Sequence, residues 1–385
     1  MTTASEDSAA TAVRPRRRHL DGAWAVALLL VSLAFFLPGF FSVPPLDRDE
    51  PRFAQASRQM VESGDFVDIR FQDETRYKKP VGIYWLQSAA VMVSGQGVEA
   101  PIWVYRLPSL LGAVLAVLLT AWAGARLFGP AVGLIGALML AGTVLLGVEA
   151  RLAKTDAALL ACIVLAEGAL ANLYLRRDRE VPAGLGTVLL LWLAVGVGLL
   201  LKGPVILLVT GGTVAALALS EWRGRWLRQT RPLLGLIVVS LLVLPWLIAI
   251  TVKSDGAFWA ASLGHDMLGK VAGGQESHGA PPGTYLGIFW ITFWPFAAFA
   301  GLALPWVWRN RGTAGVRFCL AWIVPTWIVF ELVPTKLPHY LLPVFPAIAL
   351  LIAGALVEGF PVASSRRRRW LLWGPVGLAI LLAAL

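Results

Sequence analysis

The stretch AVALLLVSLAFF at residues 25–36 decides the class of fold, because it has no charged residue and no regular alternation of polar and apolar positions. A strand of a membrane barrel alternates between lipid-facing and lumen-facing side chains, so an unbroken apolar run favours a helix. Similar runs of roughly 18 to 22 residues recur along most of the chain, and each can cross a hydrocarbon layer about 30 Å thick. The sequence therefore predicts an all-α integral membrane protein.

The composition of the 385-residue chain excludes an ordinary soluble protein. Hydrophobic residues make up 57% of the chain and charged residues only 15%, whereas soluble domains carry about 25% charged residues. The net charge of +10 does not imply a nucleic-acid partner, because Lys and Arg of membrane proteins concentrate in cytoplasmic loops. Cys162 and Cys319 lie inside apolar runs, where they act as small hydrophobic residues, and predict no disulfide.

The basic residues orient about eleven expected spans. Basic connections at 176–179, 223–231, 309–317 and 366–369 all fall on the cytoplasmic side if the N-terminal tail is inside. This topology requires residues 81–94 to form a re-entrant or interfacial helix instead of a full crossing. The expected spans are 22–43, 106–125, 131–148, 156–175, 184–201, 204–220, 233–252, 284–308, 318–333, 338–358 and 370–385.

This topology divides the chain into a disordered basic tail at residues 1–20 and a transmembrane domain at residues 21–385. Its first outer loop comprises residues 44–80, and a later outer loop comprises residues 253–283. In the first loop, Asp49 is expected to cap a surface helix over residues 50–63 that ends at Gly64. The chain stops within an apolar run, so either the last helix ends the protein or a soluble C-terminal portion follows it.

Ionisable residues from many segments collect at the outer edge of this topology. Charged groups near membrane depth are costly, and their convergence at one level indicates a functional site. Three of these residues also have a structural alternative: Asp49 as a helix cap, and Asp156 and Lys202 as side chains that extend to the membrane interface. The set comprises Asp47, Asp49, Glu50, Arg52, Lys78, Lys79, Glu149, Arg151, Lys154, Asp156, Lys202, His265, His278, Lys336, His339 and Tyr340.

The chemistry of these residues favours binding of a phosphate group. The compact ammonium of Lys202 interrupts the apolar run 199–209, and such a group suits phosphate in a partly dry groove. Lys79 and Arg151 are candidates for the same role. No pair of His or Cys has close metal-ligand spacing, so no metal site and no cofactor are predicted, although a divalent metal remains an open alternative.

A series of short motifs runs along the chain from about residue 44 to residue 343. They are DEPRF (49–53), GDF (64–66), YKKPVGIYW (77–85), RLPS (106–109), RLFG (126–129), AR (150–151) with Asp156, LKG (201–203), and KLP (336–338) with YLLP (340–343). Their identity and order resemble the bacterial aminoarabinose transferases and their protein mannosyltransferase relatives. Some relatives have Glu where this chain has Lys78, and this departure argues against a metal site built on that Glu.

The resemblance implies a GT-C fold, a bacterial inner membrane location and inverting transfer of a sugar from a polyprenyl phosphate on the periplasmic face. The acceptor is expected to be lipid A, another glycolipid or a protein hydroxyl. By motif position, Asp49 and Asp156 look like the catalytic acids, and Lys79 and Lys202 look like groups that bind the carrier phosphate. Further substrate contacts are expected from Glu50, Arg52, Tyr84, Lys336, His339 and Tyr340.

A transporter is the alternative class, in which the same ionisable groups would form an ion or substrate path. Transporters often have internal repeats and a site at the membrane midplane. This chain shows no convincing repeat, and its acids lie at the ends of the expected spans. Uptake of substrate into proteoliposomes without sugar transfer would distinguish a transporter from an enzyme.

Overall fold

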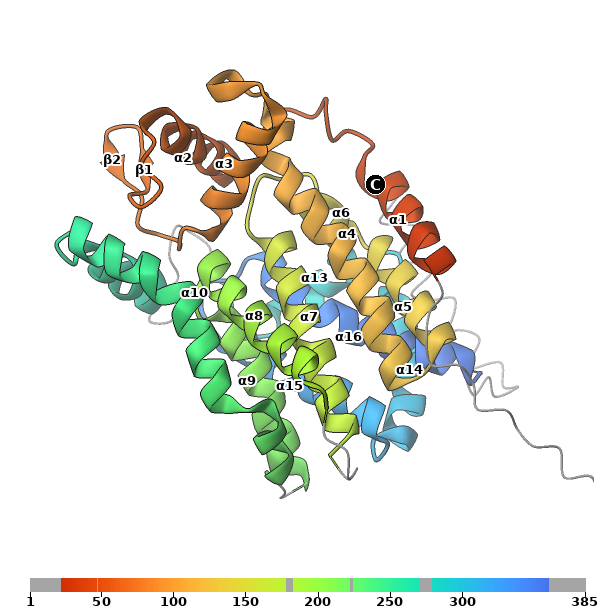
Figure 1. The fold of residues 1–385 in the computed structure, drawn as a ribbon. Coiled ribbons are helices and arrows are strands. Elements are labelled where there is room, and N and C mark those ends of the chain that lie inside the picture. The colour runs from red at the N-terminus through yellow and green to blue at the C-terminus, as the bar shows by residue number, and fades with distance from the viewer. Residues whose placement is uncertain (1–21, 47, 178–182, 222–223, 270–278, 360–385) are drawn as a thin grey trace, which may run out of the picture.

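The computed structural model describes residues 22–46, 48–177, 183–221, 224–269 and 279–359 (Figure 1). Within these ranges the chain is mostly helical, which confirms the predicted all-α class. The short strands β1 (Arg70–Phe71) and β2 (Glu74–Thr75) form an antiparallel hairpin in which Arg70 pairs with Thr75. The expected tail at 1–20 and the expected span at 370–385 lie outside the described residues.

The helices follow the apolar runs of the sequence. They are α1 (Gly22–Phe36), α2 (Asp49–Ser63), α3 (Gly82–Ser94), η1 (Gly97–Glu99), α4 (Ile102–Leu127), α5 (Pro130–Ala141), α6 (Val144–Glu149), α7 (Asp156–Leu175), α8 (Leu185–Lys202), α9 (Val205–Glu221), η2 (Arg225–Thr230), α10 (Pro232–Lys253), α11 (Ala257–Trp259), η3 (Ala260–Leu268), α13 (Thr284–Thr292), α14 (Ala297–Asn310), α15 (Ala314–Leu332), η4 (Pro338–Val344) and α16 (Phe345–Val357).

Several of these helices have the length and composition of membrane spans. Among the described residues, 6 helices qualify, or 7 if α13 and α14, which are bent by 114° at their junction, count as one span. The apolar helices α1, α5 and α9 are shorter. The chain is therefore a multi-span membrane protein, while the count of about eleven spans remains a prediction.

Helix α7 lies at the centre of the bundle and α10 at its periphery (Figure 1). In the most apolar 18-residue stretch of α7, 83% is buried inside the protein, whereas only 17% of the corresponding stretch around α10 is buried. Close approach of α7 to α4 depends on Gly112, because a Cβ there would lie 2.5 Å from the Cα of Ala158. Small residues at such crossings allow backbones of membrane helices to pack tightly. The exposed apolar face of α10 is suited to contact with lipid.

Helix α2 and the β1–β2 hairpin of the first loop gather with the adjoining helix α3 at one end of the bundle (Figure 1). Helix α2 ends at Gly64, whose φ of 67° lies in the left-handed region, as the sequence predicted. The prediction that Asp49 caps this helix is wrong, because Asp49 is its first residue and Arg48 precedes it without a side-chain capping bond. Helix α3 has only 13 residues, fewer than a crossing needs, which fits the expectation of an incomplete crossing.

Candidate active site

A cavity of about 410 Å³ lies where the segment before α3 meets α7, α8, α10, α15 and η4. We call it the Lys202 cavity. The ionisable residues of its lining are Lys78, Lys79, Asp156, Lys202, His339 and Tyr340. Most of the remaining wall is apolar, including Leu208, Leu247 and Phe330. The cavity therefore combines a cationic end with a hydrophobic wall, an arrangement suited to an amphiphile with an anionic head.

Asp156 and Lys202 meet in this cavity although they are 46 residues apart in the sequence. Asp156 begins α7 and Lys202 is the last residue of α8, so the fold brings the start of one helix beside the end of the other. The Nζ of Lys202 donates a hydrogen bond to Oδ1 of Asp156 and lies 5.4 Å from the centre of the Tyr340 ring. Both charged side chains are largely buried, which strengthens their mutual attraction relative to a surface pair.

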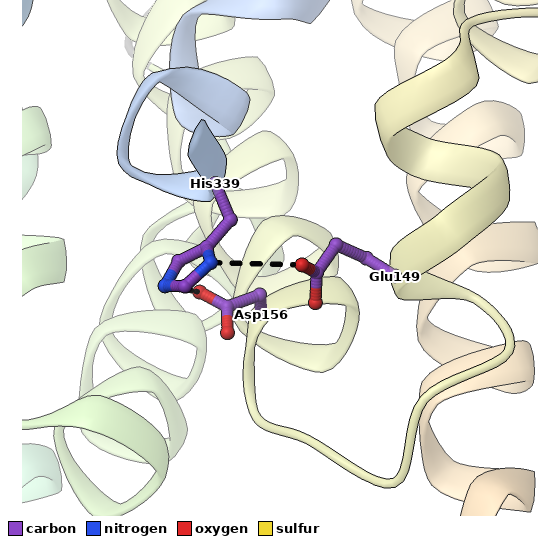
Figure 2. Close-up of side chains that lie close together, drawn as sticks. All are labelled: Glu149, Asp156 and His339. Carbon is purple, nitrogen blue, oxygen red and sulfur yellow. Dashed lines mark ion pairs between the residues drawn. The ribbon is translucent and has the colours of Figure 1, made fainter. Parts of the chain in front are cut away.

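His339 lies between two carboxylates beside this pair (Figure 2). Its Nδ1 is 3.6 Å from Oε1 of Glu149, and its Nε2 is 3.9 Å from Oδ1 of Asp156. The same oxygen of Glu149 is 3.9 Å from Nζ of Lys154. The end of α6, the start of α7 and the start of η4 thus bring three titratable groups together. Sequence reasoning placed Glu149 on the outer face but assigned it no role.

The Glu149, Asp156 and His339 side chains have the chemistry of metal ligands, and one ligand atom from each lies within 4.8 Å of the others. Two carboxylates and one imidazole are a donor set that divalent transition metals accept. However, the ammonium groups of Lys154 and Lys202 lie at ion-pair distance from these carboxylates. Because two cations already compensate the carboxylates, we derive no chemical step through a metal.

Two residues predicted to bind substrate or phosphate donate hydrogen bonds to backbone carbonyl oxygens in this structure. Lys336 is buried, and its Nζ donates to the carbonyl oxygens of Glu331 and Val333, each at 2.7 Å, at the C-terminal end of α15. Arg151 donates from Nε to the Pro38 carbonyl at 2.7 Å and also to the carbonyls of Phe35 and Gly147. Cations commonly bind the last carbonyls of helices. Both residues lie outside the lining of the Lys202 cavity.

Glu50 and Tyr84, also predicted substrate contacts, are completely buried outside the cavity lining. Oε1 of Glu50 accepts hydrogen bonds from Nε of Arg106 at 2.6 Å and from the backbone N–H of Ala153 at 3.0 Å. The ring of Tyr84 packs 5.5 Å from that of Phe53. The structure therefore gives both residues a role in holding the first loop to the bundle.

Asp49 and Arg52 lie together at the start of α2, also outside the cavity lining. Oδ1 of Asp49 is 3.6 Å from NH1 of Arg52 and 3.8 Å from NH2 of Arg76. The neighbouring Glu50 is bonded to the backbone of Ala153, three residues before Asp156 in the sequence. This bond holds the segment that carries Asp49 against the segment that carries Asp156.

Comparisons with known proteins agree with this architecture. The family model described as dolichyl-phosphate-mannose-protein mannosyltransferase matches residues 78–248. The undecaprenyl phosphate-alpha-4-amino-4-deoxy-L-arabinose arabinosyl transferase of Pseudomonas aeruginosa (strain LESB58) is 31% identical over 367 residues, covering 92% of this chain and 64% of the relative. The corresponding enzyme of Edwardsiella ictaluri (strain 93-146) is 29% identical, covering 88% of this chain and 60% of that relative.

Solved structures show the same fold. ArnT from Cupriavidus metallidurans bound to undecaprenyl phosphate superposes with a TM-score of 0.79 at 23% identity, covering 95% of this chain and 64% of that one. The chain is similar in sequence to the arabinosyl transferases and has the GT-C fold of ArnT. The oligosaccharyltransferase of Archaeoglobus fulgidus is more distant, with a TM-score of 0.62 at 14% identity over 94% of this chain and 53% of that one. The resemblance inferred from the first-loop motifs is thus confirmed.

This chain spans less than two thirds of the length of the arabinosyl transferases that it matches, at 64% for the Pseudomonas aeruginosa relative. The mannosyltransferase family model covers Lys78, Lys79, Asp156 and Lys202, whereas Asp49 and His339 lie on either side of the matched residues. The part of the Lys202 cavity that carries most of its charge therefore falls within the matched region.

Proposed function

We propose that this chain is a membrane glycosyltransferase that takes a sugar from a polyprenyl phosphate donor. The observation that carries this proposal is the lining of the Lys202 cavity, where Lys78, Lys79 and Lys202 adjoin an apolar wall formed in part by α10 and α15. Lysine ammonium groups bind phosphate as point charges, and the apolar wall suits the first isoprenoid units. The arabinosyl transferase relatives are named for an undecaprenyl phosphate sugar, and the ArnT structure holds undecaprenyl phosphate.

The proposed reaction is an inverting displacement at the anomeric carbon. The acceptor oxygen forms a bond to that carbon while the bond from the carbon to the phosphate oxygen breaks, and polyprenyl phosphate leaves with the bonding electrons. Negative charge grows on the phosphate oxygen, where Lys79 and Lys202 stabilise it. The proton of the acceptor hydroxyl passes to a carboxylate base. This chemistry requires the juxtaposition of cations and a carboxylate that the cavity provides.

Asp156 and Asp49 are the proposed catalytic carboxylates. Asp156 lines the cavity beside Lys202, and this position supports its assignment next to the expected phosphate. Asp49 lies outside the lining at the start of α2, and the bond from Glu50 to Ala153 supports its position near the start of α7. We assign Asp49 to orientation of the acceptor or abstraction of its proton. His339 and Tyr340 are assigned to the sugar-phosphate end of the cavity.

The remaining features of the proposal concern topology and acceptor. We propose about eleven spans, with the first loop at residues 44–80 and the later loop at residues 253–283 on the outer side. This topology would put the active site on the periplasmic face of a bacterial inner membrane. The domain assignment is a cytoplasmic tail at 1–20 and a catalytic membrane domain at 21–385. The acceptor is proposed to be lipid A, another glycolipid or a protein hydroxyl.

Sugar transfer from a defined lipid donor tests the proposal. The purified chain in lipid nanodiscs should convert an undecaprenyl phosphate sugar to glycosylated product in the presence of a membrane lipid or protein extract. Asp156→Asn and Asp49→Asn should each lower turnover by about 100-fold or more, the range expected for a positioned acid-base group. Asp73→Asn is the matched control, because Asp73 is an exposed aspartate of the same loop. Transfer at the wild-type rate by both Asp156→Asn and Asp49→Asn would disprove the catalytic assignment.

A further inference from the structure

Five charged or chargeable groups form a continuous chain at the edge of the Lys202 cavity. Lys154 and Nδ1 of His339 face the same oxygen of Glu149, at 3.9 Å and 3.6 Å. On the other side of the imidazole, Nε2 of His339 and Nζ of Lys202 face the same oxygen of Asp156. Two cationic groups thus converge on one carboxylate oxygen from different helices.

The burial of these groups makes their pairing energetically important. The side chains of Glu149, Asp156 and His339 are 3%, 7% and 12% exposed. A buried carboxylate that loses its cationic partner is strongly destabilised, because solvent no longer compensates the charge. A ligand that moves Lys202 away from Asp156 therefore loses binding free energy to this destabilisation, unless another cation replaces Lys202.

The proposed donor is a ligand of this kind. If Lys202 binds the phosphate, its ammonium can no longer give Asp156 the same direct contact that it makes in this structure. His339 is already 3.9 Å from the same oxygen. The imidazole nitrogen must approach that oxygen by about 1 Å to form a hydrogen bond.

We propose that donor binding exchanges the cation at Asp156, so that His339 replaces Lys202 when Lys202 moves to the phosphate. This inference rests on the proposed function and adds two positioning residues to it. His339 acts through Asp156, which it keeps ionised and oriented after Lys202 leaves. Glu149 acts through His339, because its carboxylate holds Nδ1 and so directs Nε2 toward Asp156.

The proposed exchange uses His339 in its protonated form. Neutral imidazole carries a hydrogen on only one ring nitrogen, whereas imidazolium donates from both. Here each ring nitrogen faces a carboxylate oxygen, so only imidazolium serves both acceptors. Lys154 on Glu149 and Lys202 on Asp156 complete a cluster with three cations and two anions. The excess positive charge favours the entry of a phosphate.

A double-mutant cycle on binding of undecaprenyl phosphate tests this exchange. The full chain in nanodiscs should bind the lipid, and both His339→Gln and Glu149→Gln should weaken binding by about tenfold or more, the value of one charge-assisted hydrogen bond. In an Asp156→Asn background, His339→Gln should have less than about a twofold effect, because an uncharged residue 156 needs no replacement cation. The double variant Glu149→Gln with His339→Gln should weaken lipid binding no more than either substitution alone.

Glu221→Gln is the matched control, because Glu221 accepts charge-assisted bonds from Arg177 and Arg317 and lies outside the cavity lining. The substitution should leave lipid binding unchanged, and it measures how the loss of a partly buried, paired acid affects folding. Equal weakening by His339→Gln in the wild-type and Asp156→Asn backgrounds would overturn the exchange, since His339 would then contact the lipid or support the fold. Wild-type binding by the His339→Gln chain would overturn it as well. Failure of the wild-type chain to bind the lipid would instead reject the proposed function on which the exchange rests.

Discussion

Glu50 and Arg106 form an ion pair in which both side chains are fully buried, with Nε of Arg106 2.6 Å from Oε1 of Glu50. Arg106 also donates to the carbonyl oxygens of Phe40 and Val43, at 3.0 and 2.8 Å. Glu50 accepts the backbone N–H of Ala153. One buried pair therefore ties the end of the first membrane segment, the first loop and the approach to α7 together.

Removal of one partner of this pair should destabilise the fold. Glu50→Gln or Arg106→Met leaves an uncompensated buried charge, which costs about 3–5 kcal/mol of unfolding free energy. The double variant Glu50→Leu with Arg106→Met should recover much of that loss. The control is Glu62→Gln, which breaks an exposed pair with Arg58 and should change stability by less than about 1 kcal/mol. Thermal unfolding in detergent measures these differences in stability. Similar losses of stability for Glu50→Gln and Glu62→Gln would contradict a stabilising role for the buried pair.

The lysines of the cavity should determine affinity for the donor. Lys202→Ala and Lys79→Ala each remove a cation from the expected phosphate site and should raise the donor KM or Kd by roughly 10- to 150-fold, the equivalent of 1.5–3 kcal/mol. Lys253→Ala is the control, because Lys253 pairs with Asp65 and lies outside the cavity lining. Titration with an undecaprenyl phosphate sugar provides the measurement. Unchanged kinetics for both cavity variants would remove Lys79 and Lys202 from the phosphate site.

Close packing of α3 on α8 should control the spacing of the two lysine-bearing segments. A Cβ at Gly82 would lie 2.7 Å from the carbonyl carbon and oxygen of Leu200. In the sequence, Gly82 closely follows Lys79, and Leu200 closely precedes Lys202. Gly82→Ala should therefore separate the helices, cost about 1–3 kcal/mol of stability and weaken donor binding.

Gly186→Ala provides the matched control for this substitution. Gly186 is also at a helical position, in α8, but a Cβ there would meet nothing within 4 Å. The substitution should be neutral or stabilise the chain by about 0.5–1 kcal/mol, because alanine loses less backbone entropy in a helix. Unfolding and lipid-binding measurements on both variants separate crowding from a general effect of alanine. Equal behaviour of the two variants would argue against close packing at Gly82.

The first loop should loosen at acidic pH through Asp65. Partial burial raises the pKa of this carboxyl, but hydrogen bonds from Lys253 and from the backbone N–H groups of Asp68 and Val67 outweigh burial and place the pKa below its ordinary 3.8. Because the folded-state pKa is lowered, the stabilisation is present above the unfolded-state pKa and is lost as pH falls through the folded-state value.

Hydrogen exchange at the amides of Val67 and Asp68 measures this effect, since both donate to Oδ1 of Asp65. After correction for intrinsic rates, their protection should fall as pH drops below about 4, the region in which an aspartate with a lowered pKa becomes protonated. Asp65→Asn should show protection that does not change with pH over this range, because its amide oxygen still accepts these bonds but does not titrate. Protection that stays constant from pH 6 to about pH 3 in the wild-type chain would contradict the proposed dependence.

The amino-acid sequence by itself determined the membrane class, most helix positions and the identity of the chemically important segments. Unbroken apolar runs favour helices because a bilayer supplies no partners for free backbone N–H and C=O groups. The break at Gly64 followed from local backbone preference, since glycine readily adopts a positive φ. The motifs around Lys79, Asp156 and Lys202 also indicated residues that the fold brings into one cavity.

Only the tertiary structure decided which cations face that cavity. Lys202 and Lys336 both lie near helix ends in apolar surroundings, yet Lys202 reaches Asp156 in the cavity while Lys336 binds the last carbonyls of α15. Arg151 similarly binds carbonyls at the end of α1, and Glu149 meets His339 across 190 residues of sequence. Sequence spacing specifies which face of a helix a side chain occupies, but the partner depends on how distant helices pack. The same lysine chemistry therefore supports either a helix end or a phosphate site.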